Sequence, residues 1–145
     1  MSNIDIHEDI IRAFSSCNGL NDKYITILMQ ASFLPPIPTS GKTQTKELFN
    51  CQNTSRFYYH KKNNNSIVFF GDSDSHLIKG LMSILFSCIN TESNIHLTRK
   101  DIDYIFERLG IEKQYKESLA MGFSLIIDEV FITLTTALGL ITNEK

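Results

Sequence analysis

The sequence has 145 residues, of which 42% are hydrophobic and 21% charged, and this is ordinary usage for a chain that folds around one core. Its formal net charge of -2 supplies no broad positive field, so we expect neither nucleic acid nor a membrane surface as a partner. We expect a single domain over residues 1–145.

The first third of the sequence predicts two amphipathic helices and then an exposed connection. Apolar residues recur at helical spacing from about Asp5 to Cys17, where Asp5 and Glu8 resemble a capping pair. Asn21 is the expected cap of a second helix, whose apolar stripe is Tyr24, Ile25, Leu28 and Met29. Three prolines follow, and the polar run to about Lys46 predicts an exposed connection.

The middle of the sequence predicts a small antiparallel sheet. Residues 56–60 and 66–70 are rich in aromatic and β-branched side chains and are separated by the polar run KKNNN, which indicates a hairpin. A short strand from Glu47 to Asn50 adds a third strand. After residues 71–74 the spacing becomes helical, with Ser73 or Asp74 as the expected N-cap.

The last third of the sequence predicts further helices. Thr98 with Asp101 opens one helix, and Gly110 is its expected left-handed C-terminal residue. The segment from Leu119 to Leu140 is apolar enough to raise a membrane span, but two acidic residues near its middle favour a buried C-terminal helix. The order of elements therefore predicts an α+β fold, in which a small antiparallel sheet of about three strands packs against helices.

Three cysteines have no spacing typical of a zinc site or a disulfide scaffold, so we expect free thiols and no metal. Cys17 and Cys88 lie on the apolar faces of predicted helices, where cysteine is usually a small buried hydrophobe. Cys51 stands at the end of the polar connection, just before a strand, where a loop can present a reactive side chain. The pattern alone leaves a structural and a reactive role for Cys51 open.

Four segments, in order between Ala13 and about Ile127, resemble the SufE family. Their counterparts in that family are a W-x-x-K-Y element, an L-P turn, a V-x-G-C-Q-S segment and a G-D-S-D...I-x-K-G-L block. The matching residues here are Leu20-Asn21-Asp22-Lys23-Tyr24, Leu34-Pro35-Pro36, Leu48-Phe49-Asn50-Cys51-Gln52-Asn53, and Gly71-Asp72-Ser73-Asp74 followed by Ile78-Lys79-Gly80-Leu81.

This resemblance implies a SufE/IscU-like sandwich and a role in sulfur relay. Cys51 would receive sulfur from a pyridoxal-phosphate cysteine desulfurase of the SufS type and pass it, as a persulfide, to a downstream sulfur acceptor or iron-sulfur scaffold protein. The resemblance also implies partner contacts by Asn50, Gln52 and Asp74, and no cofactor of the chain's own; the alternative role for Asp74 is to cap its helix. The N-terminal residues lack the features of a secretory or transit peptide, so we expect a cytoplasmic location.

Two departures from the family pattern leave a second function open. Asn50 stands where the family has glycine before its cysteine, and Leu119 stands where it has an arginine that can steady a thiolate. Arg56, Lys46 or backbone N–H groups around Asn50 are candidates to replace that arginine. The alternative function is an interaction module that binds a desulfurase or another partner without efficient sulfur transfer.

A third hypothesis is a thiol hydrolase in which His60 or His76 activates Cys51, although no orienting residue or oxyanion motif accompanies the pair. The four histidines are scattered among polar residues without metal-ligand spacing. The sequence Ser40-Gly41-Lys42-Thr43 ends like a phosphate-binding loop, but Pro36 stands where that motif requires glycine, so we reject a nucleotide site.

Overall fold

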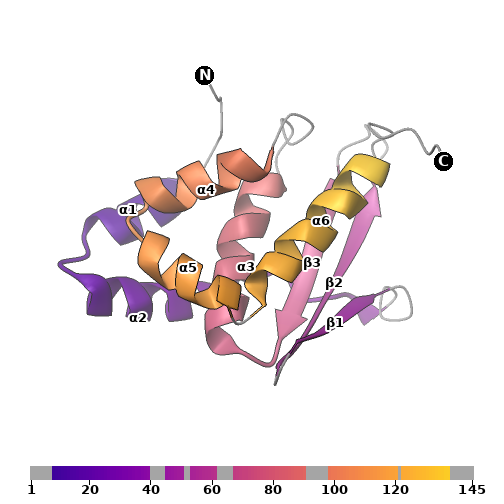
Figure 1. Cartoon of the computed structure of the whole chain (residues 1–145), viewed down its shortest axis with the longest axis horizontal. Helices are drawn as coiled ribbons and strands as arrows, with labels where there is room; N and C mark the ends of the chain where they lie inside the picture. Colours follow the sequence, from indigo (N-terminus) through magenta and orange to yellow (C-terminus); the bar gives the residue numbers. More distant parts are fainter. Residues whose placement is uncertain are drawn as a thin grey trace.

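The computed structural model of the chain describes residues 8–39, 45–50, 53–61, 67–90, 98–120 and 122–137, apart from the side chains of Phe49 and Asn50. Within these ranges it contains six α-helices, a short 3₁₀-helix (η1, Ala31–Phe33) and a three-stranded antiparallel sheet (Figure 1). The predicted α+β fold class is therefore confirmed.

The sheet has the strand order β1-β2-β3, with β1 at Lys46–Asn50, β2 at Asn53–Lys61 and β3 at Ile67–Ser73. Both the short first strand and the β2–β3 hairpin were predicted. β3 is longer than expected, because Gly71–Ser73 continue the strand where the sequence suggested a turn. The reason is pairing with β2, where Arg56 lies opposite Asp72 and Ser55 opposite Ser73.

Helix α3 (His76–Ile89) is the centre of the fold and is buried on nearly every side. It packs on the sheet through Phe86, whose ring stacks on that of Phe69 in β3 with the ring centroids 5.4 Å apart. On another side it meets α2 (Leu20–Gln30) so closely that a Cβ built on Gly80 would lie 2.0 Å from the carbonyl oxygen of Ile27. Gly80 therefore permits backbone contact between the two helices.

The predicted apolar stripe of α2 does not form its buried face. Tyr24, Ile25 and Met29 are 43%, 54% and 63% exposed, whereas Ile27 and Gln30 are buried. The close approach at Gly80 explains the difference, because it brings the Ile27 side of α2 onto α3 and turns the neighbouring stripe outward. The expected cap was also wrong: the N-cap is Gly19, which makes no side-chain cap, and Asn21 lies inside the helix.

Two other helices follow the predicted local signals more closely. Helix α1 (Glu8–Ser15) buries Ile10 and Phe14, while residues 1–7, including the predicted cap Asp5, lie outside the described residues. Helix α4 (Arg99–Arg108) begins with the predicted capping box of Thr98 and Asp101. Gly110 has the predicted positive φ, at 74°.

The predicted C-terminal helix is broken in two. Helix α5 (Glu112–Ala120) and helix α6 (Phe123–Ala137) meet at an angle of 91°, next to Gly122 with φ 104°. Burial of α6 was predicted correctly, and its buried side chains are Phe123, Ile126, Ile127, Val130 and Leu134. Among the described residues, no unbroken helix has both the length and the apolar composition to cross a membrane; α5 and α6 would qualify only as a bent pair.

Helices α3 and α6 cover the same face of the sheet. Phe57 and Phe69 on that face are buried, and Phe69 stacks on α3. Lys46, which lies opposite Phe57 in the register, reaches α6 through an ion pair with Glu129 at 3.0 Å. The other face of the sheet carries Arg56 and Asp72, which form an ion pair.

Candidate functional site

The predicted reactive residue, Cys51, joins two strands. β1 ends at Asn50, β2 begins at Asn53, and these two residues are paired. Cys51 and Gln52 are thus the two residues between a pair of strand ends, and both lie outside the described residues. The backbone of Asn50 is described, whereas its side chain is not, so the predicted partner contacts of Asn50 and Gln52 stay predictions.

A set of short polar contacts, which we call the clasp, holds the start of β2 against the start of α3. It consists of Thr54, Ser55, Ser73, Asp74 and Ser75. The N–H of Asp74 donates to the Thr54 carbonyl at 3.0 Å, and the N–H of Thr54 donates to the Asp74 carboxylate at 3.3 Å. The Ser55 and Ser73 hydroxyls lie 2.8 Å apart, and the Ser75 N–H donates to Ser73 Oγ at 3.1 Å. The clasp therefore fixes the chain three residues beyond Cys51.

The clasp corrects one prediction about the start of α3. Neither Ser73 nor Asp74 is the N-cap; the cap is Ser75, whose hydroxyl accepts the N–H of Ile78 at 3.2 Å. The Asp74 carboxylate instead accepts a hydrogen bond from the N–H of Thr54, which lies 20 residues away in the sequence. Its short spacing to the helix suggested a local cap, but pairing between β2 and β3 brings a different donor within reach.

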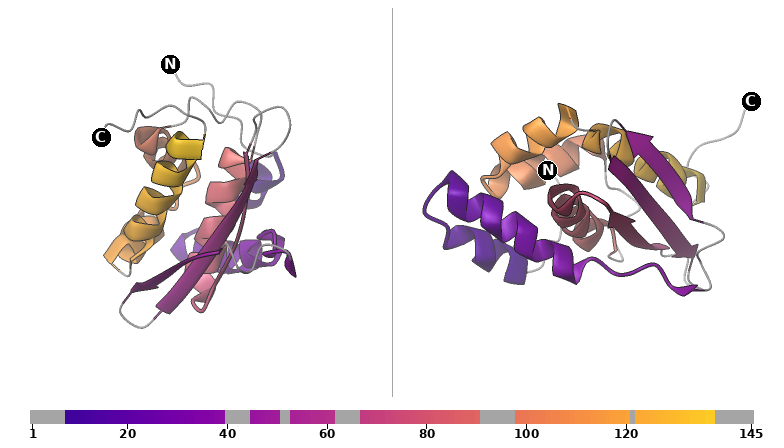
Figure 2. Two further views of the ribbon diagram at one scale, coloured as in Figure 1. Left: turned by 90° about the vertical axis from the view of Figure 1, so that its right-hand side faces the viewer. Right: turned by 90° about the horizontal axis from the view of Figure 1, so that it is seen from below.

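The junction of α5 and α6 lies beside the end of β1 in the view of Figure 1 and in both views of Figure 2. The C-terminal end of α5, whose last two residues are Leu119 and Ala120, therefore lies on the same side of the molecule as the end of β1. Leu119 is partly buried and packs against the core. The position where the family pattern has arginine therefore carries an apolar side chain in contact with the protein interior.

Both side-chain cations proposed to replace that arginine are bound to carboxylates. Lys46 pairs with Glu129 of α6. Arg56 pairs with Glu47 at 3.3 Å and with Asp72 at 3.5 Å. Each pair is partly exposed and contributes little stability, but each directs its cation toward a carboxylate of the chain itself.

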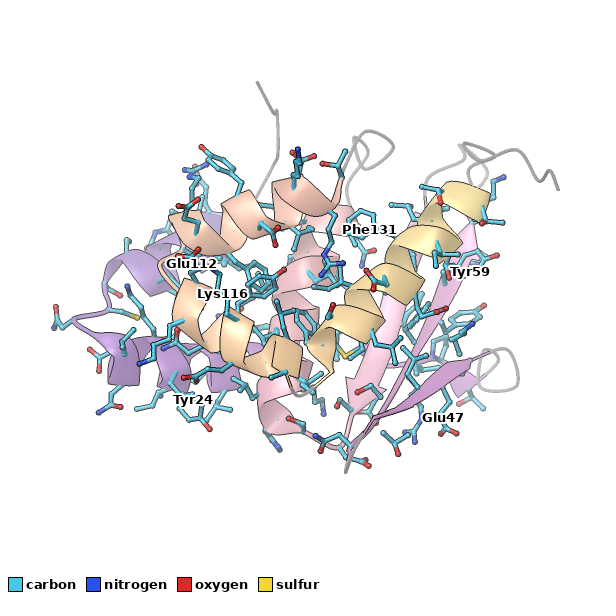
Figure 3. The ribbon with its side chains drawn as sticks, viewed as in Figure 1. Tyr24, Glu47, Tyr59, Glu112, Lys116 and Phe131 are labelled. Atoms are coloured by element: carbon cyan, nitrogen blue, oxygen red, sulfur yellow. The ribbon has the colours of Figure 1, made fainter. Side chains whose placement is uncertain are left out.

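Glu47, Arg56 and Asp72 lie directly opposite one another across the three strands, and we call this row the charge ladder. The charges of its side chains alternate in sign from β1 to β3. Lys79 of α3 adds a further positive charge beyond Asp72, with its Nζ 3.5 Å from Asp72 Oδ1. Glu47, labelled in Figure 3, occupies the β1 end of the row. The ladder lines a groove of about 740 Å³, whose other wall is formed by residues of η1 and the segment after it, Ala31, Ser32, Leu34, Pro36 and Ile37.

Of the two other cysteines, Cys88 lies on the buried face of α3 as predicted, whereas Cys17 lies beyond the end of α1, which stops at Ser15. Cys88 is buried in the core with 2% of its surface exposed, and burial raises the pKa of its thiol to about 12. Cys17 is partly buried, and its sulfur lies 3.3 Å from the Thr26 hydroxyl. A thiol that stays protonated at neutral pH is a poor nucleophile, so Cys88 is unsuited to sulfur exchange.

The hydrolase hypothesis receives no support from His60. It lies seven residues along β2 from Asn53, which corresponds to roughly 23 Å at the rise of an extended strand. His76 is nearer, at the exposed start of α3, but the described residues provide no carboxylate hydrogen-bonded to its ring. Across the described parts of the chain, no group of three or more His, Cys, Asp or Glu side chains is arranged to hold a metal ion. Residues 40–43 of the rejected phosphate-loop motif lie outside the described residues.

Comparison with known proteins gives a consistent result. Residues 8–131 match the sequence profile of SufE, described as an Fe-S metabolism associated domain. The chain is 26% identical over 123 residues to the sulfur acceptor protein CsdE of Escherichia coli (strain K12), covering 85% of this chain and 84% of that one. It is 30% identical over 118 residues to the cysteine desulfuration protein SufE of Wigglesworthia glossinidia brevipalpis, covering 81% of this chain and 82% of that one.

Proposed function

The chain belongs to the SufE family, and from this premise we propose that it accepts sulfur from a pyridoxal-phosphate cysteine desulfurase and carries it as a persulfide on Cys51. The observation that carries the proposal is the family match over residues 8–131, which includes the cysteine segment. The names of the two relatives, a sulfur acceptor and a cysteine desulfuration protein, support the same role. The proposed location is the cytoplasm, and the proposed downstream acceptor belongs to a sulfur or iron-sulfur assembly pathway.

The chemistry is thiol exchange at a sulfane sulfur. The Cys51 thiolate attacks the terminal sulfur of the donor's persulfide, and a new S–S bond forms at Cys51. The S–S bond to the donor cysteine breaks, and that cysteine leaves as a thiolate. The sulfane sulfur keeps its proton and its oxidation state, so the step needs neither an oxidant nor a reductant. Onward transfer repeats the same exchange at a second acceptor.

The described residues that were candidates to activate Cys51 are not available as counter-charges for its thiolate. The attacking group must be a thiolate, which a nearby cation or hydrogen-bond donor stabilises. Lys46 and Arg56 are already paired with carboxylates, and Leu119 is apolar. We therefore propose that the desulfurase supplies the missing positive or donor group when it docks.

The test is loading of the chain by a cysteine desulfurase with L-cysteine as substrate, followed by intact-mass measurement before and after reduction. We expect a gain of one reducible sulfur, lost in Cys51→Ser and kept in Cys17→Ser and in Cys88→Ala. The two controls remove the other thiols and therefore show whether the mass gain is specific to Cys51. Loading of wild type that persists in Cys51→Ser would refute the assignment of the carrier residue.

The second candidate function is the interaction module without efficient transfer. It is favoured by Leu119 and by the pairing of Lys46 and Arg56, because these leave Cys51 without an evident counter-charge among the described residues. The same experiment separates the two. Stimulation of desulfurase turnover that survives Cys51→Ser, together with no sulfur on the wild-type chain, would establish docking alone.

A further inference from the structure

The two margins of the sheet differ in how their backbone groups are satisfied. At β3, the N–H of Phe69 donates to Asn90 Oδ1 at 2.7 Å, and Asn90 Nδ2 donates to the Phe69 carbonyl at 3.0 Å. The next outward N–H, that of Gly71, donates to the Pro35 carbonyl at 3.0 Å. An amide side chain and a passing loop therefore take the place of a fourth strand, and this margin is closed.

The margin formed by β1 is different. The Thr54 carbonyl accepts from Asp74, so Thr54 and Arg56 direct their backbone groups toward β3, and Ser55 directs its groups toward β1. Leu48, opposite Ser55, is therefore bonded to β2, while Glu47 and Phe49 direct their N–H and C=O groups away from the sheet. Within the described residues, neither Glu47 nor Phe49 has a backbone partner on that side.

Two features that often protect an edge strand, a proline and a β-bulge, are absent from β1. β1 contains no proline, and its register with β2 runs without a bulge from Lys46 to Asn50. Lysine side chains often protect an edge strand from pairing with another strand. The Lys46 side chain instead forms an ion pair with Glu129 of α6, on the face of the sheet that the helices cover. The strand thus keeps a regular row of outward donors and acceptors.

We propose that an extended segment of the sulfur-donating partner pairs with β1 as a fourth strand, and that this pairing brings the donor sulfur to Cys51. The inference rests on the proposed function and specifies how the partner is held. β1 ends at Asn50, the residue before Cys51 in the sequence, so a segment paired with Glu47 and Phe49 lies against the part of the strand that leads to the cysteine. Backbone pairing would then set the register at which the two sulfurs meet.

The charge ladder indicates the side chain that such a segment presents. The ladder alternates from Asp72 through Arg56 to Glu47, and Glu47 is its outermost member, with 61% of its side chain exposed. A fourth strand places one residue directly opposite Glu47 on the same face. A lysine or arginine at that position continues the alternation, so the partner segment is basic there.

The sharpest test replaces one backbone donor. Glu47→Pro removes an N–H that points away from β2 and keeps the β1–β2 pairing, since edge strands tolerate proline at such positions. Glu47→Ala is the matched control, which removes the same side chain and keeps the N–H. With a desulfurase that loads the wild-type chain, we expect loading of Glu47→Pro to be slower than that of Glu47→Ala by about tenfold or more, the loss of one hydrogen bond plus the clash of the ring.

A second measurement needs no variant. Hydrogen exchange of the wild-type chain is followed with and without the desulfurase, and the Leu48 amide, already bonded to β2, is the internal reference. The amides of Glu47 and Phe49 should exchange rapidly in the free chain and become protected in the complex.

The outcomes are distinct. Equal loading of the two Glu47 variants, or unprotected Glu47 and Phe49 amides in the complex, overturns strand pairing while loading at Cys51 stands. The Glu47 and Phe49 amides could instead become protected as the concentration of the chain alone rises, while the two Glu47 variants load equally. That result would show that a second copy of the chain pairs with β1, and it would also overturn the proposal. Absence of sulfur on wild-type Cys51 rejects the proposed function itself.

Discussion

At the scale of single residues, the close approach of α2 to α3 explains why a glycine stands between Lys79 and Leu81. A methyl group there would meet the Ile27 carbonyl, and both atoms belong to helices held in the core. The contact involves backbone, so a rotamer change cannot relieve it. The glycine is thus a packing requirement between α2 and α3.

We therefore predict that Gly80→Ala lowers the free energy of unfolding by about 1–3 kcal/mol, although alanine is the better helix former. Urea unfolding followed by circular dichroism measures the change. Gly19→Ala is the control, because a Cβ at Gly19 meets nothing within 4 Å. Equal stability of Gly80→Ala and wild type would show that α2 moves away from α3 at no cost.

Single residues also show where sequence reasoning succeeds. Thr98, Asp101 and Gly110 act within one helix and its ends, so the local pattern was sufficient to place them. The hydrogen bonds of Asn90 and Asp74 were not predicted, because each residue bonds to a partner about 20 positions away in the sequence. The repeated serines around Asp74 were the available signal for the clasp, but which strand they face depends on the β2–β3 register.

At the scale of elements, the clasp joins the start of β2, which follows Cys51 in the sequence, to the start of α3. We predict that Asp74→Ala, which removes the acceptor of the Thr54 N–H, increases hydrogen exchange at Thr54 by an amount corresponding to about 0.5–1.5 kcal/mol. Nuclear magnetic resonance resolves that amide. Asp72→Ala is the matched control, because among the described residues its carboxylate pairs with Arg56 and Lys79 and not with Thr54. An unchanged Thr54 amide in Asp74→Ala would mean that the clasp does not restrain the strand end.

The elements also show the limits of a periodic pattern. The sequence predicted the three strands, because aromatic and β-branched residues alternate with polar turns. It misplaced the buried face of α2, where the helix approach at Gly80 overrides the longer apolar stripe. It also missed the break between α5 and α6, because apolar residues continue on both sides of Gly122 and only its positive φ marks the turn.

At the scale of the whole molecule, two buried weak acids, the Cys88 thiol and the Tyr115 hydroxyl, make the free energy of unfolding depend on pH in the alkaline range. Burial raises the pKa of Cys88 from 9.0 to about 12, and burial together with a hydrogen bond to Asp103 raises that of Tyr115 from 10.0 to about 12. Between the unfolded and folded pKa values, the unfolded chain holds fewer protons than the folded one. Stability is therefore full below pH 9 and falls as the pH rises from about 9 toward 12.

We predict a slope from Cys88 approaching about 1.4 kcal/mol per pH unit above its unfolded pKa. Unfolding by urea at a series of pH values from neutral to alkaline measures it. Cys88→Ala loses core contacts at every pH, but its slope should be shallower than that of wild type. Identical slopes for the two chains would contradict the assignment of the proton to Cys88.

The contrast between the two sheet margins has a kinetic consequence for a carrier. With Asn90 and Pro35 closing one side, the described sheet has room for a single added strand. Under the proposed strand pairing, a donor and a receiver that both dock at β1 would exclude each other, and no ternary complex would form. The proposed delivery would then follow a ping-pong order, in which the loaded chain departs from one protein before it meets the next.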